Sequence, residues 1–123
     1  MFLVLNSNGL FYETYNEDAM IIHFLFGYKI NKKKASFPIS SKNKVINILE
    51  NKKINYKIND SNEEITEKDF KNLNCYQKTL DKAYKISFRE KKLNNILKKI
   101  KKLDSENLEE LINMIGKYVD KKQ

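Results

Sequence analysis

The sequence predicts a mixed α+β fold: a small mixed β-sheet with flanking helices, followed by an α-helical C-terminal region. Short apolar and aromatic runs, some alternating with polar residues, precede residue 59 and are typical of strands and short helices. After residue 75, apolar residues recur three and four positions apart, which is the spacing of amphipathic helices. The acidic, Asn-rich stretch at 59–64 has turn chemistry. We therefore expect an α/β unit over 1–59 and a helical region over 60–123.

The first elements follow from local patterns. Residues 2–5 and 10–15 are apolar or aromatic and are predicted to form two strands. The Asn-Gly turn between them is typical of a hairpin. Residues 19–26 are apolar nearly all round and predict a buried helix, which Gly27 ends at a position that favours left-handed backbone.

The next elements complete a β-β-α-β-α-β order. Residues 28–34 alternate weakly and predict a strand with a basic face, which we expect Phe37-Pro38 to end. A helix capped by Ser40 or Ser41 should run to about Lys52. Alternation over 54–58 predicts a half-buried strand.

The second half is predicted to be helical. Thr66 and Asp69 favour a short helix start. Apolar residues at helical spacing over 75–103 predict a long helix with lysines on its opposite face. Asp104-Ser105 should end that helix and cap another, whose apolar stripe runs from Leu108 to Val119 as core or as a dimer seam.

The charge pattern indicates an anionic partner. The net charge is +8, and the excess is concentrated at 31–59 and 75–103. Nucleic acid is the simplest partner for such a small basic domain. Every basic residue except Arg89 is a lysine. Because an ammonium suits phosphates better than guanine edges, we expect contacts with the nucleic-acid backbone rather than readout of base sequence.

Composition argues against several other classes. One cysteine, Cys75, excludes an internal disulfide framework and fits a reducing, cytoplasmic location. A single histidine, His23, provides no zinc-ligand set, and there is no Gly-rich phosphate loop. No apolar run approaches the roughly 18 residues of a membrane span. We expect no cofactor, no metal, no membrane partner and no enzymatic activity.

An ordered series of motifs covers residues 2–58. The series comprises Gly9-Leu10-Phe11-Tyr12-Glu13, Glu17-Asp18-Ala19, Gly27, Ser36-Phe37-Pro38, the helix Val45–Leu49 and Tyr56-Lys57-Ile58. In order, spacing and residue type it resembles the N-terminal mismatch-recognition domain of MutS-type DNA mismatch repair proteins. Ser36 stands where the family motif has glycine. The resemblance implies a small mixed sheet with flanking helices.

The resemblance also implies two residue roles. Phe11 matches the phenylalanine that stacks on a mispaired or unpaired base, and Glu13 matches the glutamate that hydrogen-bonds that base. On a strand, residues i and i+2 share a face, so these two side chains should project together while Tyr12 points into the core. If protonated, Glu13 could donate to a base acceptor. The adjacent Lys32, Lys33 and Lys34 match the basic strand of the family and would hold the DNA backbone.

We therefore expect a non-catalytic protein that binds mispaired, bulged or otherwise distorted DNA. Phe11 is the expected wedge and Glu13 the base contact. Phosphate contacts are expected from Lys32, Lys33, Lys34, Lys42 and Lys44, and from a second surface with Lys98, Lys101 and Lys102. The alternative is a protein–protein adaptor or inhibitor that keeps the fold without binding DNA, its C-terminal helices contacting a protein partner or a second copy.

Overall fold

The computed structural model of the chain describes residues 1–62, 64–71 and 74–123. It confirms the mixed α+β class predicted from the sequence. The chain divides into two compact units, an α/β unit (Met1–Lys85) and a helical unit (Ile86–Gln123). The division falls inside one long helix.

The α/β unit is built on a six-stranded mixed sheet in the order β3-β4-β2-β1-β5-β6. The strands are β1 (Leu3–Asn8), β2 (Phe11–Tyr15), β3 (Ile30–Asn31), β4 (Lys34–Pro38), β5 (Tyr56–Asn59) and β6 (Ile65–Lys68). β1 and β5 run parallel, and the other neighbours among the described strands are antiparallel. The helix between β4 and β5 provides the crossover that a parallel register requires.

The helices begin and end close to the predicted positions. They are α1 (Asn16–Phe26), α2 (Lys42–Asn51) after the 3-10 turn η1 (Ile39–Ser41), α3 (Cys75–Ile100) and α4 (Ser105–Lys122). Gly27 ends α1 with a φ of 78°, and its N–H donates to the carbonyl of His23. Asp104 caps α4 by accepting from the Asn107 N–H at 2.9 Å, as predicted. Neither Ser40 nor Ser41 makes a side-chain cap on α2.

The predicted strand over residues 28–34 is wrong in extent. A two-residue loop, Lys32-Lys33, separates β3 from β4, and β4 continues through Phe37 to Pro38. Proline is tolerated there because β3 pairs only with Lys34 and Ala35, so that side of β4 is an unpaired edge at Pro38. Both loop residues have positive φ, a conformation that lysine sequences do not signal.

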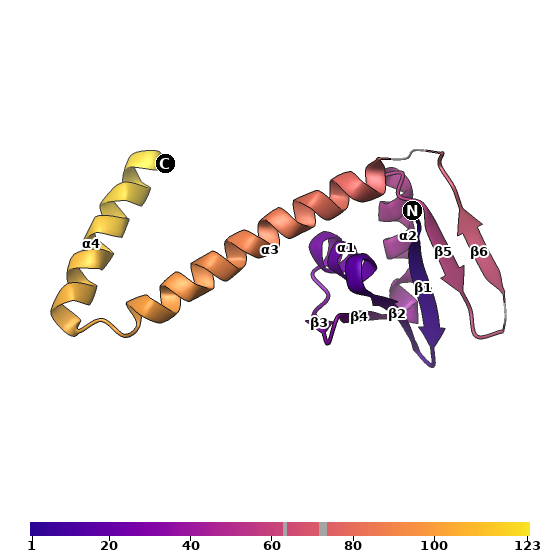
Figure 1. Cartoon of the computed structure of the whole chain (residues 1–123), viewed down its shortest axis with the longest axis horizontal. Coiled ribbons are helices and arrows are strands. Elements are labelled where there is room, and N and C mark those ends of the chain that lie inside the picture. Colours follow the sequence, from indigo (N-terminus) through magenta and orange to yellow (C-terminus); the bar gives the residue numbers. More distant parts are fainter. Residues whose placement is uncertain (63, 72–73) are drawn as a thin grey trace. The chain divides into compact units, whose positions relative to one another are not determined.

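The predicted boundary near residue 60 also differs from the observed division. Residues 59–64 link β5 to β6 in a hairpin, with the Asp60 N–H bonded to the Glu64 carbonyl; Glu63 lies outside the described residues. The predicted helix start at Thr66 is wrong, because Thr66 lies in β6 (Figure 1). All four residues of β6 are exposed, so the sequence carries no alternation that would reveal it.

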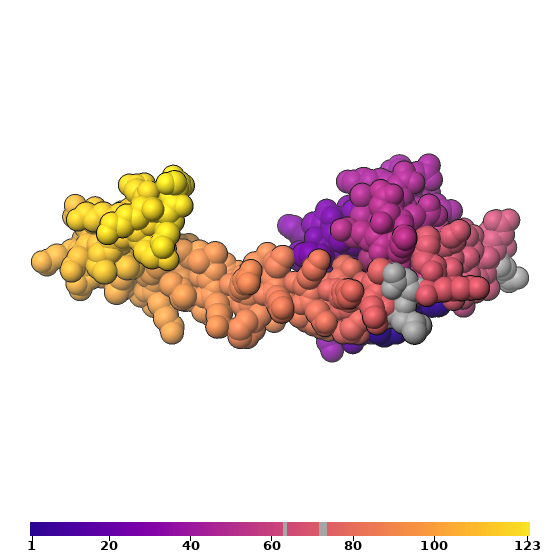
Figure 2. Space-filling view, turned by 90° about the horizontal axis from the view of Figure 1, so that it is seen from above, coloured from indigo at the N-terminus to yellow at the C-terminus, as the bar shows by residue number. Residues whose placement is uncertain are grey.

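One face of the sheet carries the core. Residues alternate between buried and less buried along β1, β2, β4 and β5. The buried set joins residues of the sheet, α1, α2 and the first turns of α3, including Tyr76 and Leu80, in one cluster. In the space-filling view the first turns of α3 lie against the rest of the α/β unit (Figure 2). Phe37 is fully buried in it, and its ring lies 5.5 Å from that of Tyr28 and 5.7 Å from that of Tyr12.

A half-buried carboxylate, Asp18, ties three elements together. The β1–β2 ladder ends at the pair Asn6 and Glu13. Beyond that pair, Asp18 Oδ2 accepts from the Val4 N–H at 3.1 Å, and its Oδ1 accepts from the Tyr76 hydroxyl at 2.5 Å. Burial raises the pKa of Asp18 above its ordinary value despite these two donors. The carboxylate thus fastens α1 to β1 and to the start of α3.

Two phenylalanines of the sheet should respond oppositely to truncation. Phe37→Ala removes a fully buried ring and should lower the free energy of unfolding by about 3–5 kcal/mol. Phe11→Ala removes a ring that is 49% exposed and should cost about 0.5 kcal/mol or less. Urea unfolding followed by tyrosine fluorescence would measure both. Equal losses would contradict the assignment of Phe11 to the surface.

Candidate nucleic-acid interface

The second face of the sheet has no buried residue among the described residues of its four central strands. We call it the open sheet face. It consists of Val4, Asn6 and Asn8 of β1, Phe11, Glu13 and Tyr15 of β2, Lys34, Ser36 and Pro38 of β4, and Lys57 and Asn59 of β5. The pairing register sets these side chains side by side, with Phe11 opposite Pro38 and Tyr15 opposite Lys34. The face is aromatic, amide-rich and basic.

Phe11 lies at one end of this face, as the i, i+2 rule predicted. Its ring is 49% exposed, while Tyr12 between it and Glu13 is buried. Leu10 in the preceding turn and Ile39 beyond Pro38 are exposed as well, and the Ile39 N–H donates to the Leu10 carbonyl at 3.0 Å. Phe11 is therefore part of an exposed apolar tip formed by Leu10, Phe11, Pro38 and Ile39.

Glu13 is the centre of a hydrogen-bond cluster. Its Oε1 accepts from the Asn8 amide at 3.0 Å and from the Lys34 ammonium at 3.3 Å. Its Oε2 accepts from the Tyr15 hydroxyl at 2.6 Å. These donors, the Tyr15 hydroxyl foremost, hold the pKa of Glu13 below its ordinary value.

The cluster decides which form of Glu13 the surface presents. Because three donors already point at the carboxylate, these contacts favour its ionised form over the protonated form. Oε2 has one protein partner, so it retains capacity to accept from an N–H group of a ligand. Glu13 is thus an oriented acceptor.

Lys32 and Lys33 form the tip of the β3–β4 hairpin. Their φ angles are 52° and 63°, a left-handed conformation that costs a residue with a Cβ about 1–2 kcal/mol. The Lys33 carbonyl accepts from the Asn16 N–H at 2.8 Å, which anchors the turn to the start of α1. With Lys34, these residues place three consecutive cations at the Tyr15 end of the open sheet face.

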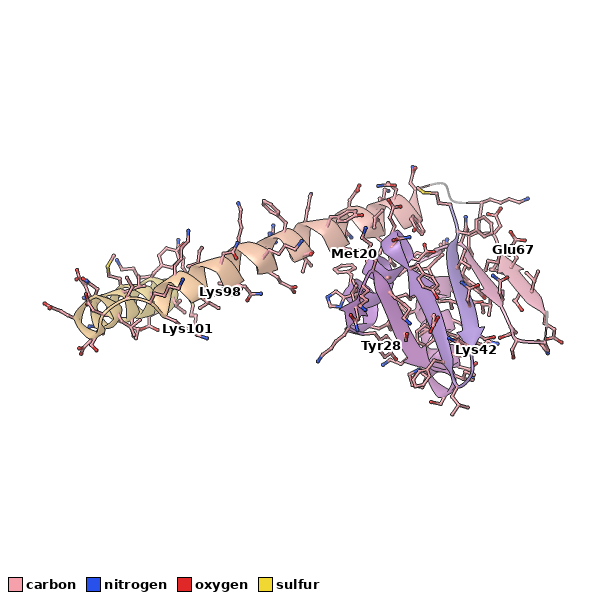
Figure 3. The ribbon with its side chains drawn as sticks, turned by 60° about the horizontal axis from the view of Figure 1, so that its bottom comes forward. Met20, Tyr28, Lys42, Glu67, Lys98 and Lys101 are labelled. Atoms are coloured by element: carbon pink, nitrogen blue, oxygen red, sulfur yellow. The ribbon has the colours of Figure 1, made fainter. Side chains whose placement is uncertain are left out.

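The other predicted lysines lie elsewhere. Lys42 is paired with Asp60 at 3.7 Å, and its ammonium lies 5.7 Å from the centroid of the buried Tyr12 ring, on the helix-covered side of the sheet. Lys44 borders a cavity of about 500 Å³ between α1 and α2. Lys98 and Lys101 project from the end of α3 and the turn after it, in the helical unit with Lys102 (Figure 3). The structure groups only Lys32, Lys33 and Lys34 with Phe11 and Glu13 on one sheet.

In the described part of the chain, the other reactive side chains do not assemble into a metal or catalytic site. His23 Nδ1 lies 2.8 Å from the Tyr28 carbonyl, so the ring is satisfied locally. Among the described residues, no three His, Cys, Asp or Glu side chains lie close enough to hold a metal ion. In the same part of the chain, none of the helices has the length and apolar content needed to span a bilayer.

Comparison with known proteins adds no assignment: no family model, curated protein or solved structure matches the chain. The interface therefore rests on its own geometry. Sequence reasoning missed Leu10, Tyr15 and Ile39. For Tyr15 a signal was available, because the i, i+2 rule that links Phe11 to Glu13 extends one step further to it.

The Glu13 cluster makes a titration prediction. Tyr15→Phe removes the strongest hydrogen bond to the carboxylate and should raise the pKa of Glu13 toward its ordinary 4.5, measured by NMR titration of the side-chain carboxyl. A carboxyl whose pKa is lower in the folded than in the unfolded protein stabilises the fold at pH values above its unfolded pKa, and this stabilisation is lost on acidification. Wild type should therefore lose stability more steeply than the variant as the pH falls below about 4.5.

Tyr56→Phe is the matched control, because the Tyr56 hydroxyl donates to Glu50 instead. It should leave the Glu13 titration unchanged. An identical Glu13 titration in wild type and Tyr15→Phe would refute the proposed cluster.

Proposed function

We propose that the protein binds DNA without catalysis and prefers mispaired, bulged or otherwise distorted duplexes. The observation that carries the proposal is the half-exposed Phe11 ring beside the oriented Glu13 carboxylate on an open sheet face. The motif resemblance to the MutS mismatch-recognition domain supports the same two roles for these two residues.

The chemistry of the face fits a weakened duplex better than a regular one. A ring that wedges at a base step must pay for unstacking, and that cost is smallest where pairing is already defective. Stacking of a base on an aromatic side chain is worth about 1–3 kcal/mol. Leu10 and Ile39 extend the apolar tip around Phe11 and would help to exclude water from the opened step.

The Glu13 carboxylate adds selectivity. As an ionised acceptor it can take a hydrogen bond from a base N–H that has lost its Watson–Crick partner. In a regular duplex the same carboxylate would face phosphates and be repelled. Lys34, which already donates to Glu13, offsets part of that repulsion.

The turn Lys32-Lys33, which we call the lysine turn, supplies the contact with the DNA backbone together with Lys34. Lys34 pairs with Tyr15 at the far end of β2 from Phe11, four residues away or about 13 Å. That separation matches a few nucleotide steps, so Lys32, Lys33 and Lys34 can contact phosphates beside the wedge. Lys42 and Lys44 lie on the helix-covered side and would not touch a duplex seated on the open sheet face. Lys98, Lys101 and Lys102 remain candidates for a second phosphate surface.

Removal of the wedge should abolish discrimination but not binding. Fluorescence anisotropy would compare a homoduplex with a single-base-bulge duplex at two salt concentrations. Wild type should prefer the bulge, and Phe11→Ala should lose the preference, a change of about 1–3 kcal/mol. The salt-sensitive background, of micromolar affinity or weaker, should persist.

Phe88→Ala is the matched control, since Phe88 is a more exposed phenylalanine outside the sheet. It should leave the bulge preference unchanged. If neither duplex binds wild type near physiological salt, the DNA proposal fails.

A substitution in the strained lysine turn should raise the stability of the fold and weaken DNA binding. Lys33→Gly should relieve the left-handed strain and raise the free energy of unfolding by about 1 kcal/mol. The same change should weaken DNA binding and lower the slope of log affinity against log salt by about 0.9, the value of one phosphate contact. Urea unfolding and salt-dependent anisotropy measure the two effects.

Lys53→Gly provides the control, because Lys53 has a φ of 54° but follows α2, outside the open sheet face. It should stabilise the fold without altering the salt slope. Equal salt slopes for Lys33→Gly and wild type would remove Lys33 from the interface.

The alternative function, a protein–protein adaptor or inhibitor, also has an observation in its favour. The helical unit exposes large apolar side chains along both of its helices, among them Leu93, Ile112 and Tyr118. Such surfaces are typical of protein interaction sites. The adaptor or inhibitor function is favoured if neither duplex binds the wild-type protein.

A further inference from the structure

The helical unit (Ile86–Gln123) has no buried residue, although the structure describes all of it. In proteins, most of the stability of a helix comes from the packing of its apolar face rather than from intrinsic propensity. Segments of fewer than roughly 40 residues rarely fold without a disulfide, a metal or a partner chain. Cys75, the one cysteine, lies outside this unit and is free. We therefore expect another surface to pack against the apolar faces of the unit.

Both helices carry a continuous apolar stripe. In α3 it comprises Leu93, Ile96, Leu97 and Ile100, and in α4 it comprises Leu108, Leu111, Ile112, Ile115 and Val119. The spacing of three and four residues places each set on one helix face. Most of these side chains are exposed, and within the two stripes only Ile100, Leu108 and Leu111, near the turn at 101–104, are partly covered.

Charge along the unit is divided in a self-complementary way. Lys98, Lys99, Lys101 and Lys102 lie at the end of α3 and in the turn. The start of α4 is acidic and carries Glu106, Glu109 and Glu110 after the capping Asp104. Its end is basic again, with Lys117, Lys121 and Lys122 against Asp120. The first part of the unit is basic as well, with Arg89, Lys91 and Lys92 against Glu90, so the acids at 104–110 are the segment of the unit that complements its lysines.

We propose that a second copy of this chain covers these faces, with α3 of each copy lying antiparallel to α4 of the other. Antiparallel pairing sets the lysines at 98–102 of one copy against the acids at 104–110 of its partner. Antiparallel pairing brings Arg89, Lys91 and Lys92 near Lys117, Lys121 and Lys122, whereas parallel pairing would set those C-terminal lysines against the four lysines at 98–102, the more basic end. The antiparallel arrangement therefore gives the larger net attraction. The antiparallel contact is isologous, so two equivalent α3–α4 interfaces close a two-fold dimer of four helices.

The charges of the two helices also indicate which partner covers them. A purely acidic partner would match α3 but be repelled by the start of α4. A second copy satisfies both helices at once and buries both apolar stripes. The inference is independent of the DNA proposal, because it uses no residue of the open sheet face.

Sedimentation equilibrium of the full chain at micromolar concentrations tests the association. Wild type should have twice the chain mass. Leu97→Asn combined with Ile115→Asn should give the monomer mass and lower the helical circular dichroism, while tyrosine fluorescence from the α/β unit stays native. Asp120→Asn, outside both stripes, should remain dimeric. A monomeric wild type, or a dimeric double variant, would overturn the proposal.

A distance measurement tests the arrangement. Spin labels on Ser105→Cys, in a chain carrying Cys75→Ser, report where the two α3–α4 turns lie. Antiparallel α3–α4 pairing puts both turns at the same end, so the labels should be closer than the length of α4, about 27 Å for its 18 residues. Labels separated by that length or more would overturn the proposed pairing.

Discussion

One-sided burial of the central sheet is the constraint on which the rest of the α/β unit depends. Alternate residues of β1, β2, β4 and β5 enter a core that α1, α2 and the first turns of α3 complete. Because the side-chain period of a strand is two, sending Tyr12 inward forces Phe11 and Glu13 outward. A phenylalanine at an exposed strand position is thus a consequence of the register that the core imposes, and its exposure does not weaken the fold.

Polar groups then organise the two sides differently. On the core side, Asp18 replaces a missing ladder partner of β1 and receives the Tyr76 hydroxyl, which fixes the start of α3 to the sheet. On the open sheet face, Glu13 collects Asn8, Tyr15 and Lys34. Partial burial raises the pKa of the first carboxylate, whereas three hydrogen-bond donors lower the pKa of the second. The same functional group thus fastens helices to the sheet in one place and, in the proposed function, contacts a base in the other.

The sequence predicted those elements that bury a stripe or carry a cap. The α1 helix with Gly27, the α4 cap at Asp104 and the inward Tyr12 all follow from local rules. It missed β6, whose four residues are exposed, since such a strand is specified by its neighbour β5 and not by its own pattern. The Lys32-Lys33 turn was missed because its lysines lack the Asn-Gly signature of that backbone. For the Glu13 cluster, strand periodicity predicted the face on which Glu13 lies. It could not predict the hydrogen bonds that Glu13 makes across that face.

The lysine turn has a consequence for how charge is displayed. A flexible loop would let its cations sample many positions and would lose that freedom on meeting a polyanion. Here the backbone of two adjacent residues, Lys32 and Lys33, is held between the paired strands β3 and β4 and is hydrogen-bonded to the start of α1. The strained turn therefore gives preorganisation: the lysine side chains extend from backbone that is already ordered, and a ligand has less backbone entropy loss to offset.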